Sequence, residues 1–264
     1  MSATVITITS GKGGVGKTTT TANLSAALAA CGKKVVAIDA DIGLRNLDVV
    51  MGLENRIVYD LVNVVEGTCR LRQAMIKDKR VDELYLIPAA QSRDKSALKP
   101  EDMVAVVDQL RDEFDFVIID SPAGIEQGFK NAVAPADRVL IVTTPEVSAV
   151  RDADRIIGLI EAEEKGPADL IVNRLRLDMV KRGDMLTTDD VIDVLAINLI
   201  GIVPDDEKII VSTNQGRPLV MENGSMAGQA FRNIGLRLMG QNVPFMSFEQ
   251  PDTFMKRLSK FLMG

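Results

Sequence analysis

One ten-residue stretch near the start of the chain restricts the possible fold more than any other feature. Residues 10–19 read Ser-Gly-Lys-Gly-Gly-Val-Gly-Lys-Thr-Thr, and they fit the phosphate-binding pattern G-x-x-x-x-G-K-[ST] from Gly11 to Thr18. The stretch follows an alternating, strand-like segment, 4–9, and precedes a helix-forming segment, 17–30. A strand, a glycine loop and a helix in this order predict an α/β fold that binds a nucleoside triphosphate.

The loop is suited to a polyphosphate because its glycines lack a Cβ atom, so backbone N–H groups can approach the phosphate oxygens. The positive end of the following helix points at the same oxygens. We expect Lys17 to bridge the β- and γ-phosphates and the Thr18 hydroxyl to ligate Mg²⁺. The residues predicted to hold the nucleotide phosphates are Gly11, Lys12, Gly13, Gly14, Val15, Gly16, Lys17, Thr18 and Thr19.

Apolar runs alternate with amphipathic stretches, such as 100–114 and 149–164, along most of the chain. This rhythm predicts a doubly wound, mostly parallel sheet of about seven or eight strands with helices on both faces. We expect strands at 4–9, 34–38, 84–88, 116–120, 139–143, 170–173 and 199–203. One nucleotide-binding domain, 1–240, would be followed by a polar, proline-containing linker, 241–251, and a short basic segment, 252–264.

The composition excludes several kinds of chemistry. The sequence contains no histidine, so proton transfer must depend on carboxylates, lysine or oriented water. Cys31 and Cys69 form no C-x-x-C pair, and we expect both to be buried or half-buried in a reducing compartment. The net charge of −6 argues against general affinity for nucleic acid. No apolar run is long enough to span a membrane, and the first strand begins too early for a signal peptide, so we expect a cytoplasmic protein.

Two of the expected strands end in aspartate, at Asp39 and Asp120. Ligands of such sheets bind at the carboxyl ends of the strands, so both carboxylates should lie near the phosphates. Asp120 is the better candidate for the acidic group on the Mg²⁺ side. For each aspartate, the alternative role is to cap the next helix. The turn-rich segments that follow, 40–46 and 121–124, are suited to loops that rearrange with the γ-phosphate.

Three motifs together resemble those of the deviant Walker A ATPases of the ParA/MinD family. They are Lys-Gly-Gly-Val-Gly-Lys-Thr-Thr at 12–19, Asp-Ala-Asp at 39–41 and Asp-Ser-Pro-Ala-Gly at 120–124. The resemblance covers essentially the whole chain and is greatest for the members that place the cell-division site. It implies an ATPase that uses ATP and Mg²⁺ and forms a homodimer when ATP is bound.

The resemblance also assigns catalytic and base-binding roles. Lys12 would cross the dimer interface to the phosphates of the other subunit, and a cation supplied in trans couples hydrolysis to dimerisation. Asp41 would orient or activate the attacking water, while Asp39 would help to organise Mg²⁺. The residues implied to contact the adenine are Asn173, Pro204 and Asp205.

By the same resemblance, the helix that includes 147–155 would lie near the dimer interface. Its charged residues Arg151, Asp152 and Asp154 are candidate contacts for a MinC-type division inhibitor and a MinE-type activator. An ordinary solvated helix face is the alternative for each of these charges.

The end of the chain predicts a helix that binds a membrane surface. At 100° per residue, its apolar side chains fall within an arc of roughly 120° and its basic side chains lie elsewhere. Such a helix suits an anionic membrane, although a helix packed on the domain is the alternative. The apolar residues are Phe254, Met255, Leu258, Phe261 and Leu262, and the basic residues are Lys256, Arg257 and Lys260.

Magnitudes indicate how such a tail works. Full burial of an apolar side chain is worth about 1.5–3 kcal/mol, and a helix in the membrane surface buries only part of each side chain. Each basic residue adds about 1 kcal/mol at an anionic surface, whereas ordering each residue costs about 1–2 kcal/mol of backbone entropy. One tail therefore binds marginally, whereas two tails on a dimer bind far better because the second event is intramolecular. ATP-dependent dimerisation would become reversible attachment to the inner face of the cell membrane.

Other functions share the nucleotide motifs. A ParA-type DNA-segregation ATPase would carry a basic DNA-binding patch rather than a basic amphipathic tail. A flagellar-placement relative normally has extra sequence before the first strand. A nucleotide-switched scaffold with incidental turnover is a further alternative. The tail and the acidic balance favour division-site placement, with ATP-bound recruitment of a septum inhibitor to the membrane and release on hydrolysis.

Overall fold

A computed structural model describes residues 2–248 of the chain. Met1 and residues 249–264 lie outside the described residues, and the expected membrane-binding helix falls among them. Within the described part, the strands form one 8-stranded sheet with the order β3-β4-β2-β5-β1-β6-β7-β8. The strands are β1 (Thr4–Thr9), β2 (Val35–Asp39), β3 (Ile76–Lys77), β4 (Leu84–Ile87), β5 (Phe116–Asp120), β6 (Arg138–Thr143), β7 (Ala168–Leu175) and β8 (Asn198–Pro204).

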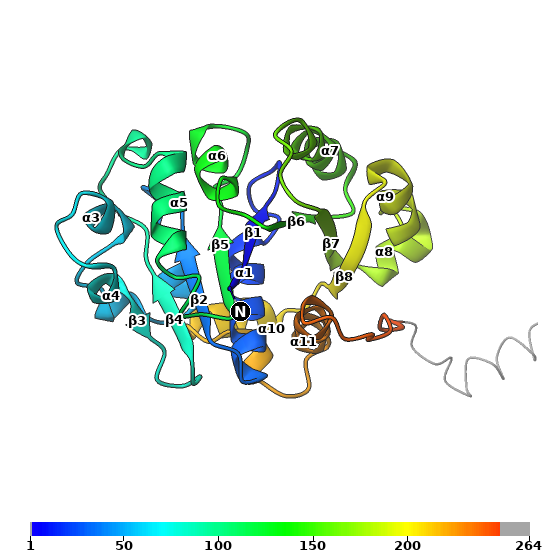
Figure 1. Cartoon of the computed structure of the whole chain (residues 1–264). Helices are drawn as coiled ribbons and strands as arrows, with labels where there is room; N and C mark the ends of the chain where they lie inside the picture. Colours follow the sequence, from blue (N-terminus) through cyan, green and yellow to red (C-terminus); the bar gives the residue numbers. More distant parts are fainter. Residues whose placement is uncertain (1, 249–264) are drawn as a thin grey trace, which may run out of the picture.

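All neighbouring strands pair in parallel except β3, which is antiparallel to β4. Helices cover both faces of the sheet (Figure 1). One layer contains α1 (Lys17–Ala30), α10 (Lys208–Asn214), η3 (Leu219–Met221) and α11 (Met226–Leu238), and the other contains α5 (Pro100–Asp108), α6 (Gln127–Val133), α7 (Val147–Ala162) and α9 (Thr188–Leu195). The shorter elements are α2 (Leu47–Val50), η1 (Glu54–Arg56), α3 (Leu61–Val65), α4 (Leu71–Ala74), η2 (Lys95–Ala97) and α8 (Leu177–Arg182).

The strands explain why both faces are covered. β2 and β5 are buried along their whole length, and alternate residues of a strand point to opposite faces. In β2, Val35 and Ala37 pack into the cluster beneath α1 and α11, while Val36 and Ile38 pack into the cluster beneath α5. Continuously apolar strands are therefore stable only between two helical layers.

The sequence-based expectations for the fold are largely confirmed. All seven expected strands are present, with ends that differ by no more than two residues. The strand β3 was missed because a two-residue strand carries no alternation. The helix expected at 100–114 ends at Asp108, and the helix expected from 149 begins at Val147. The expectation for Cys31 is wrong, because it follows the end of α1 at the surface and is exposed, whereas Cys69 is half-buried.

The order of the strands positions the candidate site. β1 lies between β5 and β6, and the loop that follows β1 leads into α1. The carboxyl ends of β1, β2 and β5 are therefore adjacent at one edge of the sheet, where ligands of such folds bind. None of the helices in the described part of the chain has both the length and the apolar character needed to cross a membrane.

Candidate active site

The loop between β1 and α1 has the backbone conformation that its glycines permit. Gly16, directly before α1, has a left-handed conformation with φ of 100°, which a residue with a Cβ rarely adopts. Space is equally restrictive at two positions. A Cβ on Gly16 would overlap the Asn173 side chain, and a Cβ on Gly11 would overlap the backbone carbonyl of Asp152 in α7. Gly11 and Gly16 therefore allow the close approach of α7 and of Asn173 in β7, in addition to the access to phosphate that the loop glycines give.

Lys17 is placed to bind the phosphates of its own subunit. It is 8% exposed, and its Nζ donates a hydrogen bond to Ser10 Oγ over 2.9 Å. Burial lowers the pKa of Lys17, and the charges of Asp120 and Asp41 oppose this shift. A buried ammonium group that is held within the loop needs little rearrangement to meet an anionic ligand.

The Asp120 carboxylate accepts hydrogen bonds from hydroxyl groups in the first turns of α1. Its Oδ1 accepts a hydrogen bond of 3.1 Å from Thr21 Oγ1, and the Thr18 side chain also hydrogen-bonds to the carboxylate. The structure thus places the two residues that were predicted on the Mg²⁺ side next to each other. Their hydroxyl and carboxylate oxygens are the hard ligands that Mg²⁺ prefers. The donor set therefore fits the metal, with Thr18 and Asp120 as the residues that would hold it.

Asp39 is a direct neighbour of Asp120 in the pairing of β2 with β5. Its Oδ1 accepts the N–H of Asp41 over 3.0 Å, and its Oδ2 accepts the N–H of Leu47 over 3.1 Å. Both oxygens thus hold the backbone of the loop that contains Asp41. This loop-ordering role was not foreseen from the sequence, and the helper role of Asp39 toward Mg²⁺ stays a prediction.

The surroundings of the two buried carboxyl groups, Asp39 and Asp120, disfavour their charged forms. Burial raises the pKa of Asp39 to about 8, with the Asp120 charge as the second cause. Burial also raises the pKa of Asp120 to about 6, although Thr18 and Lys17 lower it. Asp41 lies close enough to influence the pKa of Asp39, Asp120 and Lys17. Two adjacent desolvated carboxylates favour a bound cation.

Lys12 differs from Lys17 in its surroundings. Its side chain is 42% exposed, and its Nζ lies 3.6 Å from Glu146 Oε2. The same Nζ donates to Ser148 Oγ over 3.0 Å. Lys12 therefore reaches away from the loop to the start of α7. The sequence did not identify Glu146 or Ser148 as its partners, because no local pattern connects residues so far apart in the chain.

The three predicted partner-binding residues lie on α7, beside the loop. Arg151 and Asp154 are exposed and Asp152 is half-buried. Asp152 Oδ1 is 3.7 Å from Arg155, and its backbone carbonyl packs against Gly11. The structure therefore places Asp152 against the phosphate loop, and the role of all three residues in partner binding stays a prediction.

Of the residues predicted to contact the base, Asn173 lies against the phosphate loop. Asn173 Nδ2 donates to the Val15 carbonyl over 2.8 Å, and its buried Oδ1 has no hydrogen-bond partner among the described residues. Arg174 follows in a left-handed conformation with φ of 55°, next to an irregularity in the pairing of β7 with β8. An unsatisfied buried amide oxygen is costly and is suited to accept a hydrogen bond from an amino group.

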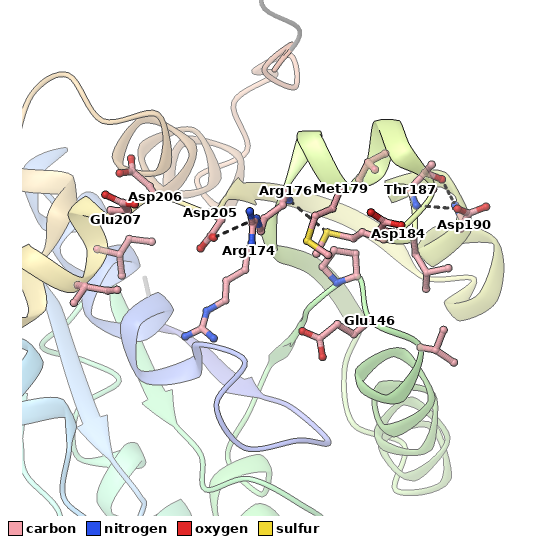
Figure 2. A pocket seen from close by; sticks show the side chains of 18 residues that line it. Glu146, Arg174, Arg176, Met179, Asp184, Thr187, Asp190, Asp205, Asp206 and Glu207 are labelled. Atoms are coloured by element: carbon pink, nitrogen blue, oxygen red, sulfur yellow. Dashed lines mark hydrogen bonds and ion pairs between the residues drawn. The ribbon is translucent and has the colours of Figure 1, made fainter.

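A groove of about 930 Å³ opens beside these residues. Asp205 lines it, and Pro204 is buried at the end of β8 directly before it. Figure 2 shows Asp205, Asp206 and Glu207 on one side of the groove, with Met179 and Thr187 on the other side. Of the lining residues, only Asp205 was predicted from the sequence, because the groove combines segments from α7, β7, α8 and α9 with the loop that follows β8.

Comparisons with known proteins agree with this geometry. A family model described as an AAA domain matches residues 3–167. The septum site-determining protein MinD of Synechocystis is 59% identical over 262 residues, which cover 98% of each chain. The chain in a MinC:MinD cell-division complex from Aquifex aeolicus has a TM-score of 0.88 and 49% identity, and the match covers 94% of this chain and 100% of that one.

A more distant solved structure contains a nucleotide. The septum site-determining protein MinD of Pyrococcus horikoshii, complexed with Mg-ADP, is 30% identical with a TM-score of 0.81. The match covers 89% of this chain and 96% of that one.

Proposed function

This chain belongs to the MinD family of septum site-determining ATPases, and we propose that it works as an ATP-controlled membrane switch. The chain is an ATPase that acts in the positioning of the division septum, and it uses a nucleotide and magnesium. The proposal is that ATP binding produces a homodimer, that the dimer attaches to the inner face of the cell membrane through two tails, and that hydrolysis releases it. Family membership favours this role over DNA segregation or flagellar placement.

The contrast between the two loop lysines carries the proposal. Lys17 is buried and held inside the loop, whereas Lys12 is 42% exposed and held outward by Glu146 and Ser148. A second cation on a phosphate loop that faces outward is suited to a nucleotide on another subunit. In trans, Lys12 would stabilise the charge that develops on the transferring phosphoryl group. Dimerisation would then be a condition for turnover.

The other residues support the same chemistry. Lys17 and the loop N–H groups would bind the phosphates, and Asp39 would keep the loop that carries Asp41 in place, so that Asp41 can orient the attacking water. Bound Mg²⁺, held by Thr18 and Asp120, would neutralise charge on the phosphate oxygens. The unpaired Oδ1 of Asn173 would accept a hydrogen bond from the adenine amino group, with Pro204 and Asp205 beside the base.

The proposed partners bind on α7. The Aquifex relative was solved with MinC, and we expect a MinC-type inhibitor to contact Arg151, Asp152 and Asp154 here. A MinE-type activator is expected on the same helix, where it would accelerate hydrolysis. The basic amphipathic segment 252–264 would hold the dimer on anionic lipid, since two weak tails bind together far better than one.

The test is co-sedimentation of the full chain with anionic vesicles in the presence of ATP or ADP. We expect the chain to pellet with vesicles in ATP and to stay largely in solution in ADP. A chain that lacks residues 252–264 should stay in solution in both nucleotides while it still binds ATP. Equal pelleting of the full chain in ATP and ADP would refute the coupling of nucleotide to membrane.

A further inference from the structure

A single arginine near the end of α11 holds the segment that follows this helix. Arg237 Nε donates to the Val243 carbonyl, and Arg237 Nη2 donates to the Pro244 carbonyl, each over 2.9 Å. Its Nη1 donates to the Ile200 carbonyl of β8, also over 2.9 Å. The guanidinium carbon lies 4.2 Å from the ring centroid of Phe245. One side chain therefore connects the segment after α11 to a strand of the sheet.

The groups around the Arg237 guanidinium are suited to holding it in this position. Burial lowers the pKa of Arg237, and no neighbouring acid among the described residues offsets the shift. Its charge is met by carbonyl oxygens and by an aromatic ring, which a planar guanidinium matches better than an ammonium group does. Charge-assisted hydrogen bonds of this kind are typically worth more than neutral ones.

Apolar contacts hold the far end of the same segment. Phe248 is 8% exposed, and Met246 packs against the core cluster that contains Ile200 and Leu238. Full burial of a side chain of this size stabilises by about 1.5–3 kcal/mol. Residues 243–248 contain no helix or strand, so these contacts and those of Arg237 fix their position.

We propose that Arg237 is a positioning residue that fastens residues 243–248 to the domain, so that only three residues of sequence, 249–251, lie between the fastened segment and the basic tail, 252–264. Residues 243–248 are called the strap below. This inference rests on the proposed membrane role of the tail. It deepens that role, because the number of residues between the domain and the tail affects how strongly the second tail of a dimer binds once the first has bound.

The strap changes the connection by a calculable amount. With the strap held, three residues, 249–251, separate the domain from the tail and can span at most about 11 Å; without the strap nine residues, 243–251, would separate them and could span at most about 32 Å. Once a tether is long enough to span the two binding sites, effective concentration falls roughly as the −3/2 power of its length, so release of the strap lowers it by up to about fivefold. Binding through a single tail does not depend on this length.

The test measures the affinity of the full chain for vesicles that contain phosphatidylglycerol, with a non-hydrolysable ATP analogue or with ADP. We expect Arg237→Ala to weaken binding in the ATP-analogue state by up to about fivefold and to leave ADP-state binding and dimer formation unchanged. Arg232→Ala is the matched control, because Arg232 lies on the same helix and binds the carbonyls of Val220 and Glu222, away from the strap. It should leave vesicle affinity unchanged.

A second variant keeps the test independent of folding. An insertion of about six Gly and Ser residues between Phe248 and Glu249 leaves the strap intact and lengthens the connection by the length of the strap, so it should weaken ATP-state binding as much as Arg237→Ala does. If both variants bind as the native chain does, or more tightly, the strap proposal is wrong. If the native chain shows no difference between the ATP analogue and ADP, the proposed function fails instead.

Discussion

Replacement of Asp120 by asparagine should stabilise the nucleotide-free protein, although Asp120 belongs to the proposed metal site. Asp120 is fully buried next to Asp39, and its pKa is raised from 3.8 to about 6. A rise of about two pKa units corresponds to a cost of about 3 kcal/mol for keeping the carboxylate charged. Asparagine removes that charge and can keep the hydrogen bond from Thr21.

The expected gain is smaller than the full cost. The new amide group is buried and leaves a donor to be satisfied, which costs about 1–3 kcal/mol. We therefore expect a net gain of about 1 kcal/mol, or a rise in Tm of about 2–4 °C for a chain of this size. The measurement is thermal unfolding by circular dichroism without nucleotide and then with Mg-ADP. The Mg²⁺-dependent part of the stabilisation by Mg-ADP should be largely lost in Asp120→Asn.

The dependence on pH gives a further check with a defined sign. The folded-state pKa values of Asp39 and Asp120 are raised above their unfolded-state values. Their contribution to the free energy of unfolding is therefore most favourable at pH values below about 4, and it is lost as pH rises through about 6 for Asp120 and about 8 for Asp39. The stability of the nucleotide-free protein should therefore fall as pH rises over this range. The fall should be shallower in Asp120→Asn.

Asp169→Asn provides a control of opposite sign. Asp169 is also a buried carboxylate of the sheet, but it is paired with Arg138 and accepts a hydrogen bond from Asn198. Removal of its charge leaves the arginine without its ionic partner and should lower stability by about 3 kcal/mol. A lower Tm for nucleotide-free Asp120→Asn, or an unchanged pH slope, would refute the reasoning, because the native site would then already compensate the Asp120 charge.

Three further predictions concern residues of the site. Lys12→Ala should keep nucleotide affinity and lose the turnover that depends on protein concentration, which steady-state ATPase assays at several concentrations can check; turnover that is independent of concentration and equal to that of the native chain would contradict the trans role. Asp152→Lys should reduce MinC-type and MinE-type partner binding in pull-down assays without a change in ATP affinity, and full retention of both partners would remove this residue from the partner surface. Asn173→Ala should weaken ATP binding by about threefold to tenfold, which corresponds to the free energy of one hydrogen bond, and should weaken GTP binding less. Nucleotide competition titrations measure both affinities, and an equal loss for ATP and GTP would argue against adenine recognition by Asn173.

The features predictable from the sequence are those that adjacent residues encode. The phosphate loop, the aspartates at the ends of β2 and β5 and seven strands follow from local patterns, and the structure places Lys17, Thr18 and Asp120 together. Contacts between distant segments were not predictable. The ion pair of Lys12 with Glu146 and the hydrogen bonds from Arg237 to β8 depend on how the layers pack.

Some local features were also hidden in the sequence, because they depend on conformation. The left-handed backbone at Arg174 has no glycine to indicate it, and it occurs where β7 and β8 fall out of register. Asp39 was expected to act toward the metal. Its hydrogen bond with the N–H of Leu47 was not predictable, because it depends on the turn that brings Leu47 back to Asp39.

The contact between Gly11 and α7 has a thermodynamic consequence. Because the loop backbone touches the backbone of Asp152 without an intervening side chain, any movement of the loop is imposed directly on the helix. If a ligand of α7 binds one nucleotide state more tightly than another, the two binding events are linked. The factor by which the nucleotide changes the affinity of that ligand then equals the factor by which the ligand changes the affinity of the nucleotide. A protein that bound this helix with a preference for one nucleotide state would thus act as an effector of nucleotide binding, even where it touched no atom of the nucleotide.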